Sequence, residues 1–387
     1  MAKELAFALI NPYTISKSRT GGVIGRFIAR TGLELVAARV FGPSQELAEK
    51  YAELLRNDRE IHDDIRSILA DYVLRQYGPD PKTGKPRRVM MLLFEGEDAV
   101  SRLERVTGNI RYTTASADTI RDTYGDLILD ESGKVGYFEP AVLIAPDREA
   151  VGPALKLWAE YSEKDGGLIE GAIDLPAKGE VQKTLVLIKP DNFQFPSARP
   201  GNIIDLFSGS GLRIIGAKVY RMSVAEAQDF YGPVRVALRE KLKGMVAERA
   251  AAALSAEFGF SIPEDSQKKL GDVMGPLYGD DQFFQIIKFM TGCWLPDCNE
   301  EEAAKCGKHR SLALVYAGVD AVNKIRNILG PTDPGKAQPG QVRREFGQDI
   351  MVNAAHASDS PENAQREMKI VKVEKDDIKT WVRKYYP

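Results

Sequence analysis

A histidine near the C-terminal end, in polar surroundings, is the residue best suited to chemistry. His356 follows a short apolar run at 350–352, which the pattern predicts to be a buried strand. Ser360 precedes a proline, a pairing typical of a helix N-cap, so we expect a helix over 361–371 that carries Glu367. Backbone N–H groups at a helix start favour negative charge. The spacing therefore places one imidazole where an anion could bind.

The segment around this histidine has a known counterpart. Residues Asn353 to Glu367, N-A-A-H-A-S-D-S-P-E-N-A-Q-R-E, resemble the active-site segment of nucleoside diphosphate kinases, N-x-x-H-G-S-D-S-x-x-x-A-x-x-E. That family passes the γ-phosphate of a nucleoside triphosphate to a nucleoside diphosphate through a phosphohistidine. The resemblance implies that His356 is the nucleophile, with Ser358 beside it and Glu367 orienting the ring. Ala357 stands where the family has glycine.

The resemblance extends over most of 184–370 and implies a nucleotide site. Phosphoryl transfer needs positioned cationic donors, and a guanidinium offers a planar fork of them. One stacked aromatic ring can accept any base, which predicts broad nucleotide tolerance. The residues implied to hold phosphates and sugar are Lys189, Arg326, Thr332, Arg343 and Asn353, with Tyr231 near the nucleophile and Phe284 (or its neighbour Phe283) stacking on the base.

The protonation state of the histidine also matters. Neutral imidazole is the attacking form, and a reference pKa near 6.5 leaves a histidine largely neutral at pH 7. A carboxylate such as Glu367 that accepts the other ring N–H would fix the tautomer. We expect Mg²⁺ to arrive on the β- and γ-phosphate oxygens of the nucleotide, with few protein ligands.

Length and composition bound the class of protein. A chain of 387 residues favours two domains. A net charge of −2 gives no electrostatic reason to expect nucleic acid or an anionic membrane as partner. Three cysteines argue against a disulfide framework, and the opening residues lead straight into a strand-like run without a signal peptide. We therefore expect a cytoplasmic protein.

Two stretches of the chain share the same order of landmarks. Each has an apolar strand, a loop, a helix, a strand and a helix, and later a strand that ends in aromatic-x-Gly before another helix. The order βαββαβ is the ferredoxin-like arrangement, an α+β fold with antiparallel sheets. A duplication explains the shared order better than the alternative, two α/β units whose turn residues are similarly placed by chance. We predict tandem domains over 1–172 and 181–387, with a boundary around 175–180.

The first copy lacks the chemistry of the second. Asn11, Glu104, Ile110 and Leu143 stand where the second copy has the lysine, an arginine, the threonine and the histidine, whereas counterparts of Tyr231 and Arg343 survive as Tyr51 and Arg121. A hairpin is predicted at 130–136. We expect a structural or regulatory partner, with residual nucleotide binding as the alternative. Since family members form dimers, the chain is expected to be a homo-oligomer or an internal pseudo-dimer.

Two insertions interrupt the second copy. Residues 235–281 are rich in alanine and charge and predict helices. Residues 293–309 contain a set of metal-ligand types that could form a structural Cys₃His zinc site, and reduced cysteines in a surface loop are the alternative. These residues are Cys293, Cys298, Cys306 and His309.

Two functions of different classes follow. The first is an enzyme, a nucleoside diphosphate kinase with one working domain and one degenerate copy. The second is a non-catalytic nucleotide-sensing or scaffolding protein on the same fold. The completeness of the second site favours the enzyme.

Overall fold

The structure is a computed structural model that describes residues 3–58, 63–110, 118–172, 179–305 and 307–387. Cys306 of the predicted zinc site lies outside the described residues, as does most of the predicted domain boundary. The boundary therefore remains a prediction.

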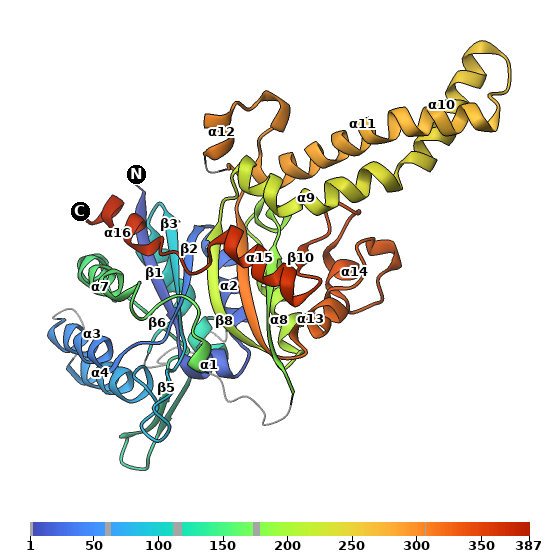
Figure 1. Ribbon diagram of the computed structural model, residues 1–387. Coiled ribbons are helices and arrows are strands. Elements are labelled where there is room, and N and C mark those ends of the chain that lie inside the picture. The colour runs from blue at the N-terminus through green and yellow to red at the C-terminus, as the bar shows by residue number, and fades with distance from the viewer. Residues whose placement is uncertain (1–2, 59–62, 111–117, 173–178, 306) are drawn as a thin grey trace. The chain divides into compact units, whose positions relative to one another are not determined.

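The described residues contain two four-stranded sheets with the same topology (Figure 1). In each, the spatial order is the fourth, first, third and second strand along the chain, which confirms the predicted ferredoxin-like α+β arrangement. The first sheet contains β1 (Glu4–Ile10), β2 (Glu34–Phe41), β3 (Val89–Gly96) and β6 (Val142–Ile144), and the second contains β7 (Val181–Ile188), β8 (Arg213–Tyr220), β9 (Ser311–Val319) and β10 (Ala355–Ala357). We call the described parts of 1–172 the first module, and 181–220 with 312–387 the second module.

The helices of the first module follow its strands in the predicted order. The predicted extra hairpin is confirmed as β4 (Asp126–Leu129) and β5 (Val135–Glu139), which pair antiparallel. The helices are α1 (Pro12–Ser16), α2 (Thr20–Thr31), α3 (Gln45–Asn57), α4 (Asp63–Gln76), α5 (Ala99–Thr107), α6 (Ile120–Tyr124), α7 (Arg148–Tyr161) and η1 (Glu170–Ala172).

The second module repeats this order and adds a C-terminal helix. Its helices are η2 (Pro190–Phe193), α8 (Arg199–Ser208), α13 (Ala321–Leu329), η4 (Pro334–Lys336), α14 (Val342–Phe346), α15 (Pro361–Val371) and α16 (Ile378–Tyr385). The predicted helix at 361–371 is confirmed as α15, and its N-cap Ser360 accepts a hydrogen bond from the Asn363 N–H.

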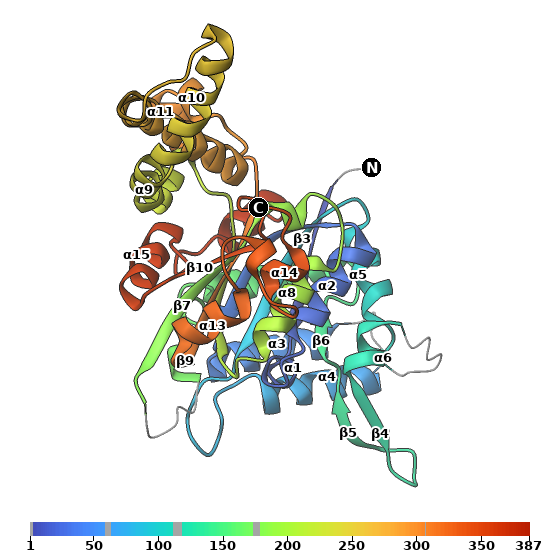
Figure 2. The same ribbon diagram turned by 90° about the vertical axis from the view of Figure 1, so that its right-hand side faces the viewer.

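The two modules pack through equivalent elements. Helix α2 crosses α8 (Figure 2), and strand β2 contacts β8. Glycines permit the helix crossing, because a Cβ on Gly201 would lie 2.2 Å from the carbonyl oxygen of Gly21. The Asp205 carboxylate also accepts a hydrogen bond from the Gly22 N–H at 3.1 Å. Equivalent surfaces of the two modules thus meet each other, which is the geometry of a two-fold interface.

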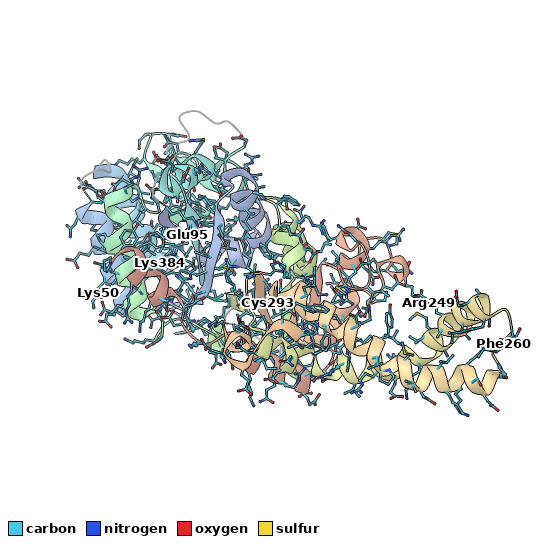
Figure 3. The ribbon with its side chains drawn as sticks, turned by 90° about the horizontal axis from the view of Figure 1, so that it is seen from above. Lys50, Glu95, Arg249, Phe260, Cys293 and Lys384 are labelled. Carbon is cyan, nitrogen blue, oxygen red and sulfur yellow. The ribbon has the colours of Figure 1, made fainter. Side chains whose placement is uncertain are left out.

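Two further segments, residues 167–169 and the C-terminal helix α16, also hold the modules together. Between β2 and β8, the Gly167 N–H donates to Val40 O and the Ile169 N–H to Ile215 O, so this stretch bonds to one strand of each module. The C-terminal helix α16 packs on α7 and β2. There Lys384 Nζ lies 2.8 Å from a carboxylate oxygen of Glu95 (Figure 3). Buried apolar side chains of both modules form one continuous core.

The segment Arg221–Ser311 forms a second compact unit, which is helical. It contains α9 (Val224–Lys241), α10 (Lys243–Phe258), α11 (Glu264–Thr291), η3 (Leu295–Asp297) and α12 (Glu300–Ala304). Helix α11 approaches α9 and α10 through glycines spaced four residues apart, since a Cβ on Gly271 would lie 2.6 Å from Lys243 O. None of the described helices is long and apolar enough to cross a membrane.

The glycine crossing between the modules predicts a stability effect. The three atoms nearest to a Cβ on Gly201 are all backbone atoms at 2.2–2.6 Å, so the helices would have to separate. We expect Gly201→Ala to lower the free energy of unfolding by about 1–3 kcal/mol, as overpacking does. Gly136→Ala is the control, because its Cβ would meet only an ordinary contact at 3.5 Å. Urea denaturation measures both, and equal midpoints for the two variants would contradict the close packing.

Candidate functional site

Strand β10 fixes the position of His356. It pairs antiparallel with β7 so that His356 lies opposite Leu187, and just beyond the ladder the Lys189 N–H donates to Ala354 O. Side chains alternate along a strand, so Leu187 and Lys189 share a face and His356 joins them as a cross-strand neighbour. The histidine and the lysine therefore lie on the same face at one edge of the sheet.

The strand predicted over 350–352 is wrong, because the strand begins at Ala355 and contains His356. The Asp349 carboxylate accepts hydrogen bonds from the Met351 and Val352 N–H groups, both at 2.7 Å. These donors are therefore used in a turn and cannot enter a ladder. Ile350 is 65% exposed, so the apolar run is not buried as a strand would be.

A buried carboxylate holds the imidazole. His356 Nε2 lies 2.9 Å from an oxygen of Glu367, and the hydroxyl of Ser358 donates to the same oxygen at 2.6 Å. Glu367 is buried on α15, whereas 22% of the His356 side chain is exposed. Because the carboxylate accepts, Nε2 carries the ring proton, which leaves Nδ1 as the basic nitrogen. The arrangement orients the ring and leaves it accessible from solvent.

Three cationic side chains bond to the backbone on either side of this histidine. Lys189 Nζ donates to Met351 O at 3.1 Å, and Arg343 Nη2 donates to Ala355 O at 3.2 Å. The exposed Arg326, on α13, donates to Asp359 O at 3.3 Å. The structure thus brings together the lysine and both arginines that the sequence predicted. Positive charge at this density suits a polyanion.

Lys189 has an unusual protonation equilibrium. The side chain is buried, and its Nζ donates to the side-chain oxygen of Asn353 at 2.6 Å. Burial, together with repulsion from Arg343, lowers the pKa of Lys189 to about 7. An anion bound beside it would favour the charged ammonium and raise the pKa.

Asn353 links the loop after α13 to the histidine segment. Its amide nitrogen donates to Thr332 O at 3.0 Å and to Ile350 O at 2.7 Å. Thr332 itself is exposed. The sequence did not single out Asn192, which donates to both Lys189 O and Ala354 O and so ties the two strand ends together. Its only signal was its place directly after the strand in P-D-N.

Tyr231 and Phe284 belong to the helical unit Arg221–Ser311. Tyr231 is buried on α9. Phe284, on α11, contacts Trp294 edge-on with ring centroids 5.9 Å apart, and the Arg235 guanidinium lies over its ring at 5.9 Å. Their roles toward a nucleotide remain predictions.

The first module repeats the backbone of this site. Leu143 lies opposite Leu9, as His356 lies opposite Leu187. Arg121 donates to Gly108 O at 2.6 Å and to Val142 O at 3.4 Å, which repeats the bonds of Arg343 to Gly330 O and Ala355 O. The equivalences that the sequence suggested at Leu143 and Arg121 therefore hold in the structure.

In the first module, the position that corresponds to Lys189 belongs to a buried polar cluster. Tyr77 donates to Asn11 at 2.7 Å, Asn11 donates to Glu139 at 3.2 Å, and Tyr72 donates to the other oxygen of Glu139 at 2.7 Å. Burial raises the pKa of Glu139, while these hydrogen bonds act against the rise. This cluster was not predicted from the sequence, where its one indication is Glu139, two residues before the turn at Ala141.

Comparison with known proteins agrees with this geometry. A sequence model of the family described as "Nucleoside diphosphate kinase" matches residues 4–132 and 302–376, which is more than half of the chain and includes part of each module. The chain belongs to the nucleoside diphosphate kinase family.

The chain is also similar to individual proteins named nucleoside diphosphate kinase. The protein of that name from Bdellovibrio bacteriovorus is 28% identical over 188 residues, which cover 49% of this chain and 90% of the relative. The one from Staphylothermus marinus is 26% identical over 200 residues, covering 52% and 98%. A solved nucleoside diphosphate kinase of Aquifex aeolicus is 26% identical, covers 50% of this chain and 95% of its own, and has a TM-score of 0.30.

The family's usual glycine after the histidine is not required by this backbone. Ala357 is a strand residue of β10 and is absent from the residues with positive φ. The left-handed position is Ala354, with φ of 70°. Alanine at 357 therefore introduces no backbone strain.

The predicted zinc ligands are only partly described. Cys293 and Cys298 are free thiols, and His309 Nδ1 lies 2.9 Å from Phe289 O. Burial, with Cys293 nearby, raises the pKa of Cys298. Among the described residues, no three histidine, cysteine or acidic side chains are grouped to hold a metal ion. The zinc site stays a prediction.

Metal analysis tests the zinc prediction. We expect close to one equivalent of zinc in protein purified without chelators, and a loss of most of it in Cys298→Ser, because a thiolate ligand is removed. The matched control is Ser255→Ala in α10. Less than a tenth of an equivalent in the unmodified chain would contradict the site.

The lowered pKa of Lys189 predicts pH-dependent binding of ADP. A group whose pKa rises on binding contributes fully below its free pKa and is lost as pH rises between the two values. We expect affinity for ADP to be constant below pH 7 and to fall toward about tenfold per pH unit above it. Calorimetry between pH 6 and 9 measures this, with Lys189→Gln as the variant that should lose the step. A flat profile in the unmodified chain would contradict it.

Proposed function

We propose that this chain transfers the γ-phosphate of a nucleoside triphosphate to a nucleoside diphosphate through a phosphohistidine at His356. The observation that carries the proposal is the 2.9 Å contact between His356 Nε2 and buried Glu367, on the sheet face that Lys189 shares. Membership of the nucleoside diphosphate kinase family supports it. A held, accessible imidazole beside clustered cations is the arrangement that phosphoryl transfer to a protein nucleophile requires.

The first half-reaction uses the lone pair on His356 Nδ1. It attacks the γ-phosphorus, an N–P bond forms, and the bond from that phosphorus to the β-phosphate oxygen breaks, so a nucleoside diphosphate leaves with the electron pair. Positive charge develops on the ring, and Glu367 stabilises it through the Nε2–H hydrogen bond. Ser358 restrains the same carboxylate oxygen. The second half-reaction reverses these steps with the β-phosphate oxygen of another diphosphate as nucleophile.

Lys189, Arg326 and Arg343 would neutralise charge on the phosphate oxygens as the transferring group passes between donor and ring. Thr332 and Asn353 would add donors to the phosphate and sugar oxygens. Mg²⁺, when bound, would neutralise charge on the β- and γ-phosphates, held chiefly by their oxygens because the neighbouring side chains of this site are cationic. For Tyr231 and Phe284 we propose the roles that the family resemblance implies, Tyr231 near the nucleophile and Phe284 stacking on the base.

A scaffold or nucleotide sensor on the same fold is the competing function. The departure from the family pattern at Ala357 would favour it, but the backbone of β10 accommodates this alanine without strain. The first module, which lacks the histidine, the lysine and one arginine of the second, is still consistent with a scaffold or sensor. Turnover with ATP and GDP decides between the two.

Substitutions at the site test the enzyme. We expect His356→Gln to abolish transfer from ATP to GDP, by at least about a thousandfold, because removal of a covalent nucleophile costs orders of magnitude. Glu367→Gln should cost about 10- to 100-fold, the equivalent of one hydrogen bond to a charged group at about 1.5–3 kcal/mol. A coupled assay of GTP formation measures both.

Glu362→Gln is the matched control for Glu367→Gln, since it changes an exposed glutamate of the same helix. It should leave turnover within about twofold of the unmodified chain. Near-normal transfer by His356→Gln would exclude the proposed nucleophile. Absence of transfer in the unmodified chain would favour the scaffold.

A further inference from the structure

The first module contains a cavity of about 250 Å³. Apolar side chains from α3, α4, the loop after α5 and the β6 region form most of its wall. They include Leu55, Leu69, Ile110, Leu143, Ile144 and Pro146. The polar side chains at the cavity are Glu104, Asn109 and Arg121.

The position of this cavity follows from the repeated backbone. Leu143 occupies the ladder position of His356, and Arg121 bonds to its surroundings as Arg343 does. Gly108 ends α5 with φ of 88°, and Gly330 ends α13 with φ of 83°. The cavity therefore lies at the site of the first module that corresponds to the histidine site of the second.

The groups around the cavity disfavour phosphate. Leu143 replaces the histidine, and Glu104 brings a negative charge to the helix position that Arg326 has in the second module. Asn11, in place of the lysine, is buried under Tyr77 and Glu139. Arg121 is retained with the same pair of carbonyl bonds as Arg343, but it is not accompanied by counterparts of Lys189 and Arg326. An anionic tail would meet a carboxylate and an apolar wall with one of the three cations of the second module.

The same surroundings suit an uncharged ring that carries hydroxyl or amino groups. Apolar walls bind an aromatic ring, and a few polar groups at the rim orient it. The exposed Glu104 and Asn109 can accept hydrogen bonds from such groups. A volume of about 250 Å³ is below the range of about 300–1,000 Å³ for drug-sized ligands, so the occupant is small.

We propose that the first module binds a nucleoside without phosphates in this cavity and excludes nucleotides. The choice of a nucleoside rests on the proposed function, because the corresponding site of the second module is assigned to a nucleotide. The cavity and the charged side chains at it are observed in the described residues and do not depend on the proposed function. The chain would thus carry a catalytic site and a separate site that responds to dephosphorylated nucleosides.

Calorimetry on the full chain tests this, with saturating ADP present to occupy the second module. The probes are adenosine, guanosine, cytidine and uridine. We expect one equivalent of at least one nucleoside to bind, and its monophosphate to bind at least tenfold more weakly. Ile110→Trp should abolish this binding by filling the cavity. Ile128→Trp is the matched control, because Ile128 is 59% exposed on the β4–β5 hairpin.

A substitution that reverses a charge at the cavity tests the proposal without filling it. Glu104→Arg, an exposed substitution, should reduce the preference for nucleoside over monophosphate by at least threefold. Binding of none of the four nucleosides, equal binding in Ile110→Trp, or equal affinity for monophosphates would overturn the proposal. Transfer from ATP to GDP, measured in parallel, reports on the proposed function separately, and Ile110→Trp should retain it.

Discussion

The buried carboxylate of Glu367 is the constraint on which the candidate site depends. One of its oxygens contacts both His356 Nε2 and the Ser358 hydroxyl, so it determines the direction of the ring and the nitrogen that carries the proton. The carboxylate is buried because α15 packs on β7, the strand that also positions the histidine through β10. His356, Glu367 and Lys189 are therefore all positioned by β7. A shift of α15 would change ring orientation and ring chemistry together.

The two modules show how the same backbone can carry different chemistry. Ala141 and Ala354 both have positive φ before the fourth strand of their sheet, and Arg121 and Arg343 make the same pair of carbonyl bonds. These features position a site in either module. What differs is the set of side chains that face it, since the first module places leucine where the second has His356. Retention of the backbone with loss of the histidine, the lysine and one arginine agrees with a change of ligand.

Features with local causes could be predicted from the sequence. Helix α15 was predicted from Ser360 before a proline. Both sheets were predicted from apolar runs that recur in the same order, separated by similar turn residues. The run at 350–352 misled because its amides are held by the Asp349 side chain, a contact that hydrophobic pattern does not report. The Glu139 cluster joins residues far apart along the chain, such as Tyr72, and no short motif encodes it. Long-range side-chain contacts required the structure.

Phosphorylation of His356 is tested most directly by the intact mass of the full chain after brief exposure to ATP. We expect a gain of one phosphoryl group, located on His356 by fragmentation, labile to acid and removed when GDP is added. A chain that gains no phosphate, or one whose phosphate resides on another residue and persists after GDP, would contradict it.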